Sequence, residues 1–226
     1  MFNFLTQIDS TGNSSAMASQ AESVWGVLAK GGLLMIPLMA LFATAVFFFI
    51  ERMIAIRKAS KIDDNFMNII RDNIVTGNIT AARSLAKNTS NPVARMIDKG
   101  IQRIGKPIDA IEKSMDNVGV LEMYMMEKNL SILSIISRIA PLFGFLGTII
   151  GMLSLFKGIA STSEYTPNTI ADGIYIKMIT SATGLIIGIL TYMGFSYLTA
   201  QIKRVENKMD AASAEFVDIL QEPTKV

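Results

Sequence analysis

Three long apolar stretches dominate the pattern of hydrophobic and polar positions along this chain of 226 residues. They cover residues 33–50, 139–156 and 178–198, and none of them contains a charged residue. Each stretch is roughly 18 to 21 residues long, which is enough for a helix to cross a hydrocarbon core of about 30 Å. The pattern therefore predicts three transmembrane helices.

The segment between the first two stretches has a helical pattern, with apolar residues three or four positions apart and no strand-like alternation. A break at 76–78 and the pair Asn91-Pro92 divide it into shorter helices. After Pro107 the helical pattern continues into the second stretch, which predicts one helix of about 45 residues. The third stretch continues similarly to about Leu220. We expect an all-α, polytopic membrane protein in which two of three transmembrane helices extend far into a helical cytoplasmic region.

Basic residues predict the orientation of these helices. Only Lys30 is basic before the first stretch, whereas clusters of Lys and Arg follow the first and third stretches. Positively charged flanks favour the cytoplasmic side, so the N-terminus is expected outside. The expected organisation is an outer segment 1–30, transmembrane helices 31–52, 138–157 and 175–199, a cytoplasmic helical region 53–137, an outer loop 158–174 and a cytoplasmic C-terminal helix and tail 200–226.

Composition narrows the possible chemistry. Half of the residues are hydrophobic, and the sequence contains neither cysteine nor histidine. Disulfides, thiolate nucleophiles and the usual zinc sites are therefore excluded. The net charge of +2 is too close to zero to indicate nucleic-acid binding. We expect no enzyme, no cofactor, no metal site and no nucleic-acid partner.

Small residues recur at helical spacing in the second and third apolar stretches. Gly147 and Gly151 form a G-x-x-x-G pair, Gly144 and Thr148 form a parallel pair, and Gly184 with Gly188 repeats the spacing. Such pairs allow two membrane helices to approach closely. Two interpretations stay open for the hydroxyl residues on these faces: ordinary helix contacts with bonds to their own backbone, or a partly polar layer inside the membrane. The candidate hydroxyl residues are Thr148, Thr180 and Ser181.

No carboxylate lies within any of the three stretches. Because proton carriers usually place an acid at mid-membrane, a partner would have to supply one if protons move. Asp172 and Lys177 stand near the outer end of the third helix. They could pair, face a water-filled entrance, or mark the interface with Lys177 extending toward the headgroups.

Residues 140–152, Ala-Pro-Leu-Phe-Gly-Phe-Leu-Gly-Thr-Ile-Ile-Gly-Met, are similar to the most specific signature of the ExbB/TolQ/MotA family of proton-channel subunits, and ExbB most of all. Residues 30–38 and 50–52 resemble the first transmembrane helix of that family. Gly184-Leu185, preceded by hydroxyl residues, resembles its third helix. The resemblance covers nearly the whole chain.

The resemblance implies an inner-membrane homopentamer whose second and third helices form a central pore. An ExbD/TolR-like single-helix partner would carry the essential aspartate in that pore, and a TonB-like protein would receive the work of outer-membrane transport. Thr148 matches a pore-facing threonine, and Ser181 falls where a second is expected, with Thr180 beside it. Pro141 and the glycines are expected to pack helices and contact the partner; membrane lipid is expected around the assembly.

Two positions depart from the family pattern. Ile176 occupies a place where many relatives have a glutamate, which leaves the role of Asp172 as a substitute open. Ile189-Leu190 replaces an Ile-Pro pair, which suggests a straighter third helix. A TolQ-like subunit, or a subunit of a gliding or defence motor, remains an alternative. A structural scaffold that conducts no ions is another. The coupling ion could also be sodium.

Overall fold

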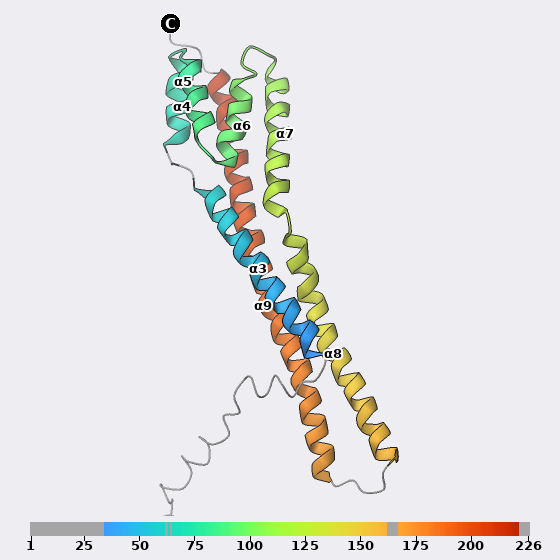
Figure 1. Cartoon of the computed structure of the whole chain (residues 1–226). Helices are drawn as coiled ribbons and strands as arrows, with labels where there is room; N and C mark the ends of the chain where they lie inside the picture. The colour runs from blue at the N-terminus through green and yellow to red at the C-terminus, as the bar shows by residue number, and fades with distance from the viewer. Residues whose placement is uncertain (1–33, 62, 64, 162–166, 222–226) are drawn as a thin grey trace, which may run out of the picture. The chain divides into compact units, whose positions relative to one another are not determined.

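The computed structural model describes residues 34–61, 63, 65–161 and 167–221, except for the side chains of Thr169, Asp172 and Ile176. Throughout these ranges the regular structure is helical, without strands. Figure 1 shows the helices in chain order. They are α3 (Met35–Ser60), α4 (Phe66–Val75), α5 (Ile79–Asn88), α6 (Pro92–Ile101), α7 (Ile108–Glu127), α8 (Leu130–Ser161) and α9 (Pro167–Gln221).

The chain divides into two compact units. Unit 1 comprises Met1–Leu41 and Ile139–Ile187, and unit 2 comprises Phe42–Arg138 and Gly188–Val226. Three helical stretches are long and apolar enough to cross a membrane, Met35–Ser60, Ile108–Ser161 and Gly173–Gln221. The predicted fold class, with three membrane-spanning helices of which two are long, is confirmed.

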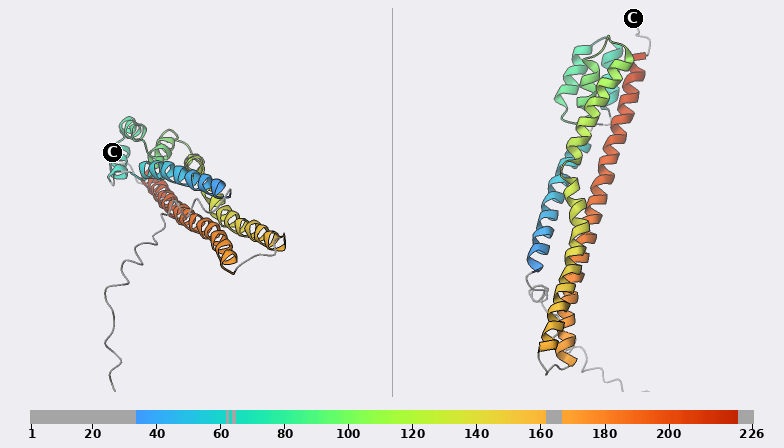
Figure 2. Two further views of the ribbon diagram at one scale, coloured as in Figure 1. Left: turned by 60° about the horizontal axis from the view of Figure 1, so that its bottom comes forward. Right: turned by 90° about the vertical axis from the view of Figure 1, so that its right-hand side faces the viewer.

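Unit 2 has one continuous hydrophobic core in which helices α4 to α7 pack against α9. The aromatic ring of Phe216 on α9 is fully buried in this core, to which Met115 of α7 and Ile97 of α6 also belong. Gly100 of α6 makes this packing possible, because a Cβ there would lie 2.6 Å from Met115 Sδ and 2.7 Å from Phe216 Cε1. The two further views show the short helices lying along the C-terminal part of α9 (Figure 2).

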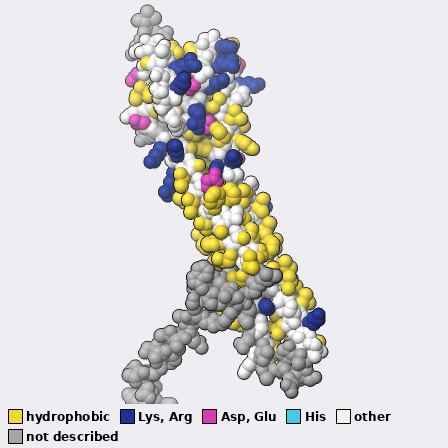
Figure 3. Space-filling view, in the orientation of Figure 1, with side chains coloured by type: hydrophobic (Ala, Val, Ile, Leu, Met, Phe, Trp, Pro, Cys, Tyr) yellow, Lys and Arg dark blue, Asp and Glu magenta, His cyan; other side chains and the backbone are white. Residues whose placement is uncertain are grey.

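Charged side chains gather over α4 to α7 of unit 2, whereas apolar side chains predominate over α3 and α8 (Figure 3). The apolar surface fits helices that are long and apolar enough to cross a membrane. In a membrane this apolar surface can face either lipid or other helices, because lipid tails are as apolar as the side chains themselves.

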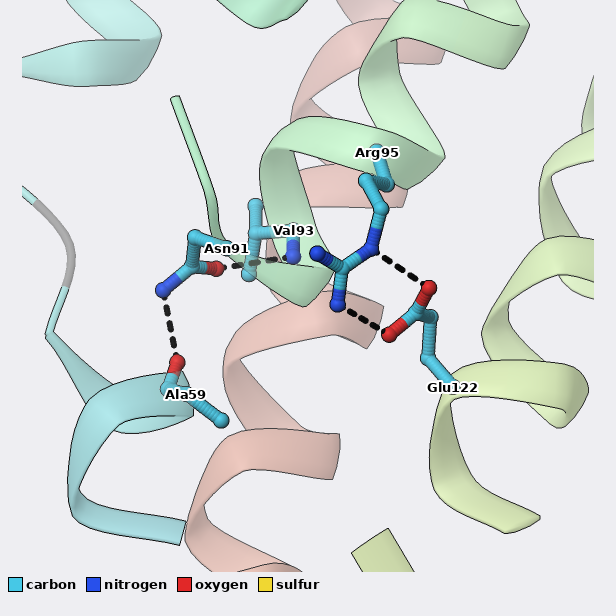
Figure 4. Close-up of polar contacts among 5 residues, drawn as sticks. All are labelled: Ala59, Asn91, Val93, Arg95 and Glu122. Carbon is cyan, nitrogen blue, oxygen red and sulfur yellow. Dashed lines mark hydrogen bonds and ion pairs between the residues drawn. The ribbon is translucent and has the colours of Figure 1, made fainter. Parts of the chain in front are cut away.

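Asn91 fixes the start of α6 and ties it to the end of α3. Its side-chain oxygen accepts a hydrogen bond of 2.8 Å from the amide of Val93, as expected for an N-cap residue before Pro92. Its side-chain nitrogen donates to the carbonyls of Ala59 at 2.6 Å and Lys61 at 2.8 Å. The close-up view shows the cap and the bond to Ala59 (Figure 4).

Arg95 and Glu122 join α6 to α7 a short distance away (Figure 4). Arg95 Nε donates to Glu122 Oε1 at 2.6 Å, and Nη2 makes a second, parallel bond to Oε2. The hydrogen bond that Arg95 donates to the Glu122 carboxylate raises the pKa of Arg95 above its ordinary value. The carboxylate is only 6% exposed, so this bidentate pair compensates the burial of its charge.

The predicted helix of about 45 residues is wrong, because it is interrupted at Lys128 and Asn129. Lys128 leaves the helix with φ −49° and ψ 134°, and Asn129 adopts a left-handed φ of 65°. Asparagine tolerates this conformation better than most residues, so neither glycine nor proline is needed to end the helix. The structure therefore has two helices, α7 and α8, at this place.

Elsewhere the predicted boundaries differ in length rather than in kind. The break at 76–78 and the start of α6 at Pro92 are confirmed, and α9 continues to Gln221 without interruption. α8 continues to Ser161 and α9 begins at Pro167, so both helices extend into the predicted loop 158–174. The predicted outer segment 1–30 lies outside the described residues.

Candidate functional site

The predicted pore helices α8 and α9 meet in unit 1 at a glycine-to-glycine contact. A Cβ added to Gly184 would lie 2.6 Å from the carbonyl oxygen of Ala140 and 2.8 Å from Cα of Gly144. A Cβ added to Gly144 would lie 3.1 Å from the carbonyl oxygens of Thr180 and Ser181. Since backbone atoms occupy the space on both sides, only glycine fits at Gly184 without separating the helices.

Side chains from one helix fill the glycine positions of the other along the same seam. The methyl carbon of Thr180 would lie 2.8 Å from a Cβ on Gly147, and Leu34, the residue before α3, would also lie within 4 Å of that Cβ. The aliphatic stem of Lys177 crosses Gly151, and Leu155 lies against Gly173. We call this alternation of glycines and side chains, from Ala140 to Leu155 on α8 and from Gly173 to Gly184 on α9, the α8–α9 seam.

The three candidate hydroxyl residues differ in their surroundings. Thr180 is fully buried in the seam, whereas Thr148 and Ser181 are half-buried beside it. Thr148 Oγ1 donates a hydrogen bond of 2.6 Å to the carbonyl oxygen of Phe145, one turn earlier in α8. A hydroxyl oxygen also accepts hydrogen bonds. The oxygen of Thr148 can therefore still accept one from water or from a donor on another chain.

Lys177 brings a positive charge to the predicted outer end of the seam. Its side chain is half-buried and rests on the backbone of Gly151, so its stem is held between the two helices. The side chain of Asp172, the predicted neighbour of Lys177, is not among those that the structure describes. The pairing of Asp172 with Lys177 therefore stays a prediction. No carboxylate is among the side chains described for unit 1.

The remaining predicted packing residues occupy different settings. Pro141 is half-buried within α8, where its ring removes one backbone hydrogen bond from the helix. Gly188 is buried but belongs to unit 2, so it is not part of the α8–α9 seam. Unit 2 also holds residues that the sequence did not single out for their contacts, such as Glu122 and Arg95.

The chemistry available at the seam is limited to hydroxyls, backbone carbonyls and one ammonium group. Within the described ranges, no three His, Cys, Asp or Glu side chains are grouped so that they could hold a metal ion. Hydroxyls and water can form a continuous chain of hydrogen bonds along a helix. A hydroxyl group, however, does not readily release its proton near neutral pH. The seam can therefore line a polar path, and none of the side chains described in it supplies an acid.

Comparison with known proteins places these helices in a family. The model of the MotA/TolQ/ExbB proton channel family matches residues 88–211, which include α6, α7, α8 and most of α9. The match therefore covers the α8–α9 seam and helices α6 and α7 of unit 2, whereas α4 and nearly all of α5 precede it.

Three relatives illustrate the similarity. The chain is 26% identical over 162 residues to a putative biopolymer transport protein ExbB homolog of Methanothermobacter thermautotrophicus, covering 71% of this chain and 57% of the relative. It is 36% identical over 90 residues to the biopolymer transport protein exbB1 of Vibrio cholerae, covering 39% and 40%. It is 21% identical over 213 residues to the Tol-Pal system protein TolQ of Pseudomonas aeruginosa, covering 88% and 92%.

The matched region thus spans about half the length of the first two of these relatives, and nearly all of the third. Both ExbB-named and TolQ-named proteins are similar to the chain, so these comparisons separate the family from others but not its branches. With a family match over more than half of its residues, and with three helices able to cross a membrane, this chain belongs to the MotA/TolQ/ExbB proton channel family.

Proposed function

We propose that this chain is the pore-forming subunit of an ExbB-like proton-driven motor in the bacterial inner membrane. In this proposal Thr148 and Ser181 provide hydroxyls to the proton path, and an aspartate from an ExbD/TolR-like partner accepts the proton. The observation that carries the proposal is the pairing of half-buried hydroxyls beside the α8–α9 seam with the lack of any described carboxylate in unit 1.

A homopentamer around the partner's membrane helix is the assembly that we propose. Family membership supports an oligomeric pore, and the exposed faces of the membrane-spanning helices provide surface for neighbouring copies. Among the exposed apolar side chains of unit 1 are Phe145 and Leu185, from α8 and α9 respectively. These side chains would be buried against neighbouring copies, the partner or lipid.

Work done by the complex would pass to a TonB-like protein and drive outer-membrane transport. The names of two similar proteins, which describe biopolymer transport, support this branch. The similarity to TolQ supports a Tol-type envelope role as the second candidate. The N-terminus would lie outside and residues 53–137 and 200–226 in the cytoplasm, as the basic flanks predict.

A substitution at Thr148 tests the proton path directly. Thr148→Val removes the hydroxyl at nearly constant volume, so the packing of α8 should change little. Purified complexes would be placed in liposomes with a pH-sensitive dye inside and driven by a potassium diffusion potential. We expect proton uptake to fall by about tenfold or more if the hydroxyl is part of the path, since loss of one well-placed hydrogen bond to a charged group costs about 1.5–3 kcal/mol.

Thr199→Val is the matched control. Thr199 also donates to a carbonyl of its own helix, from Oγ1 to Phe195 at 2.9 Å, but it lies in unit 2 at the cytoplasmic end of the predicted third span. This control should conduct as the unchanged protein does. Equal conduction by both variants would overturn the role of Thr148, and no conduction by any form of the assembled complex would favour the scaffold hypothesis.

A further inference from the structure

An acidic groove lies in unit 2 between α7 and α9. It is a cavity of about 620 Å³ that contains four carboxylates and no lysine or arginine among its lining residues. One of these carboxylates, Glu206, pairs with Lys203 at 2.8 Å; Lys203 lines the adjoining groove rather than this one. The acidic side chains of the acidic groove are Asp116, Glu127, Glu206 and Asp210.

Large apolar side chains stand in the same groove without cover from this chain. Val120 is 69% exposed and Tyr124 is 73% exposed, and both line the cavity from α7. Leu121, which follows Val120 in α7, is also largely exposed. Exposed apolar side chains gathered beside charged groups are typical of an interaction surface. The groove therefore favours an occupant that carries both apolar and basic side chains.

A basic stripe that carries both kinds of side chain lies on α3 of the same chain and ends at Lys61, the residue that follows α3. Its members are spaced by three or four residues, which places them on one face of the helix. All five are exposed, with the apolar residues first and the basic residues toward the C-terminal end. The basic stripe consists of Ile50, Ile54, Arg57, Lys58 and Lys61.

A hydrogen bond fixes the level of the basic stripe relative to the acidic groove. Arg52 Nη1 donates to the carbonyl oxygen of Met125, so these two residues lie side by side in unit 2. α3 and α7 run in opposite directions (Figure 1). Nine residues beyond Arg52 and nine before Met125 both correspond to about 13 Å of helix, which brings Lys61 and Asp116 to a similar level. By the same count Ile54 lies level with Met123, one residue from Tyr124.

We propose that the basic stripe of one copy docks into the acidic groove of the next copy around a ring. A rotation about an axis along the helices keeps every residue at its level, so groups that match in height within one chain also match between neighbouring copies. The lining of the acidic groove includes no residue of α3, so the groove is open to the α3 of another chain. The inference rests on the proposed homo-oligomer and assigns the surface by which its copies meet.

Cysteine cross-linking tests this surface, because the chain has no cysteine of its own. A variant with both Ile54→Cys and Tyr124→Cys should form a ladder of cross-linked products up to the full ring when a short bis-maleimide is added. Either variant alone should remain monomeric on a denaturing gel, since the two residues belong to opposite sides of the contact. Co-expression of the two single variants should stop at dimers.

A second pair of cysteines controls for random collision. Ile69 of α4 is exposed but lies outside both surfaces, so Ile69→Cys with Tyr124→Cys should give no ladder. Charge reversal gives an independent measurement. Asp116→Lys should accelerate subunit exchange about two- to fivefold, as expected for loss of an exposed ion pair, and adding Lys61→Glu should restore the original rate.

The outcomes separate this inference from the proposed function. If the native mass of the complex shows a ring but the Ile54–Tyr124 pair gives no ladder and Lys61→Glu gives no rescue, the docking surface is wrong and the proposed pore remains. If the purified protein is monomeric in detergent and in nanodiscs, the proposed homo-oligomer fails, and the docking surface with it.

Discussion

Arg52 donates a hydrogen bond of 3.2 Å from Nη1 to the carbonyl oxygen of Met125, and so joins α3 to the last turn of α7. The last four carbonyls of a helix have no partner within it, so this bond satisfies one of them. The other terminal nitrogen of Arg52 donates to Glu51 at 2.6 Å, and Asn129 makes a longer contact of 3.5 Å to the same carboxylate. Arg52 and Glu51 of α3 therefore contact the break between α7 and α8 at Met125 and at Asn129.

Replacing Arg52 should loosen that break. Arg52→Lys keeps the charge but loses the forked geometry that reaches Glu51 and Met125 together. We expect amide hydrogen exchange around residues 125–132 to become roughly tenfold faster, which corresponds to a loss near 1.4 kcal/mol. Mass spectrometry of the protein in detergent measures this directly.

Arg57→Lys is the control for that experiment, because Arg57 lies on the same helix but is exposed. Its exchange pattern at residues 125–132 should match that of the unchanged protein. Identical exchange in both variants would show that the hydrogen bond from Arg52 does not stabilise the break.

Asn129 should tolerate glycine better than alanine. Its φ of 65° lies in the left-handed region, which costs an ordinary residue about 1–2 kcal/mol and glycine little. Asn129→Ala should therefore lower the free energy of unfolding by about 1 kcal/mol, whereas Asn129→Gly should leave it nearly unchanged. Denaturant titration in mixed micelles distinguishes the two. A greater loss with glycine than with alanine would mean that the side-chain contact to Glu51 matters more than the backbone conformation.

The Arg95–Glu122 pair should contribute the same coupling energy at pH 7 and at pH 10. A double-mutant cycle with Arg95→Met and Glu122→Gln should give about 1 kcal/mol, modest because about half of the Arg95 side chain is in water. The raised pKa of Arg95 means that its contribution is fully present below the pKa of the unfolded arginine and is lost only as the pH rises through the higher folded value. A coupling energy that decreased between pH 7 and pH 10 would contradict this assignment.

The sequence predicted those features that depend on neighbouring residues. The uncharged run at 139–156 predicted a membrane-spanning part of α8, and Asn91-Pro92 predicted the first turn of α6. The break at Asn129 was missed because periodicity continues through it, and because a single asparagine in the left-handed conformation leaves no trace in the apolar pattern. Asparagine is itself a weak signal for the end of a helix, and this one was present in the sequence.

The contacts of the α8–α9 seam depend on how two distant segments align along their axes. Spacing predicted that Gly147 and Gly151 would favour close packing, but it did not predict that Thr180 and Lys177 would fill those positions. The order of residues in one helix does not fix its register against another. The proton-path roles of Thr148 and Ser181 remain predictions, since they depend on neighbouring chains and on a partner.

Alanine at Gly184 should separate α8 from α9, whereas alanine at Gly119 should be accepted. A Cβ on Gly184 would meet the backbone of Ala140 at 2.6 Å and of Gly144 at 2.8 Å, and backbone atoms cannot turn aside as a side chain can. A Cβ on Gly119 would lie 3.6 Å from the terminal methyl carbon of Met209, an ordinary contact. Both substitutions remove a glycine from a helix and gain up to about 1 kcal/mol of helix propensity.

The difference between the two variants therefore reports the fit of the seam. We expect Gly184→Ala to lower the free energy of unfolding by about 1–3 kcal/mol, as overpacking usually does, and Gly119→Ala to leave it equal or slightly higher. Denaturant titration in mixed micelles measures both. If Gly184→Ala proved as stable as Gly119→Ala, α8 and α9 would not be held together by backbone contact at this position, and Thr180 would not be fixed in its place beside Gly147.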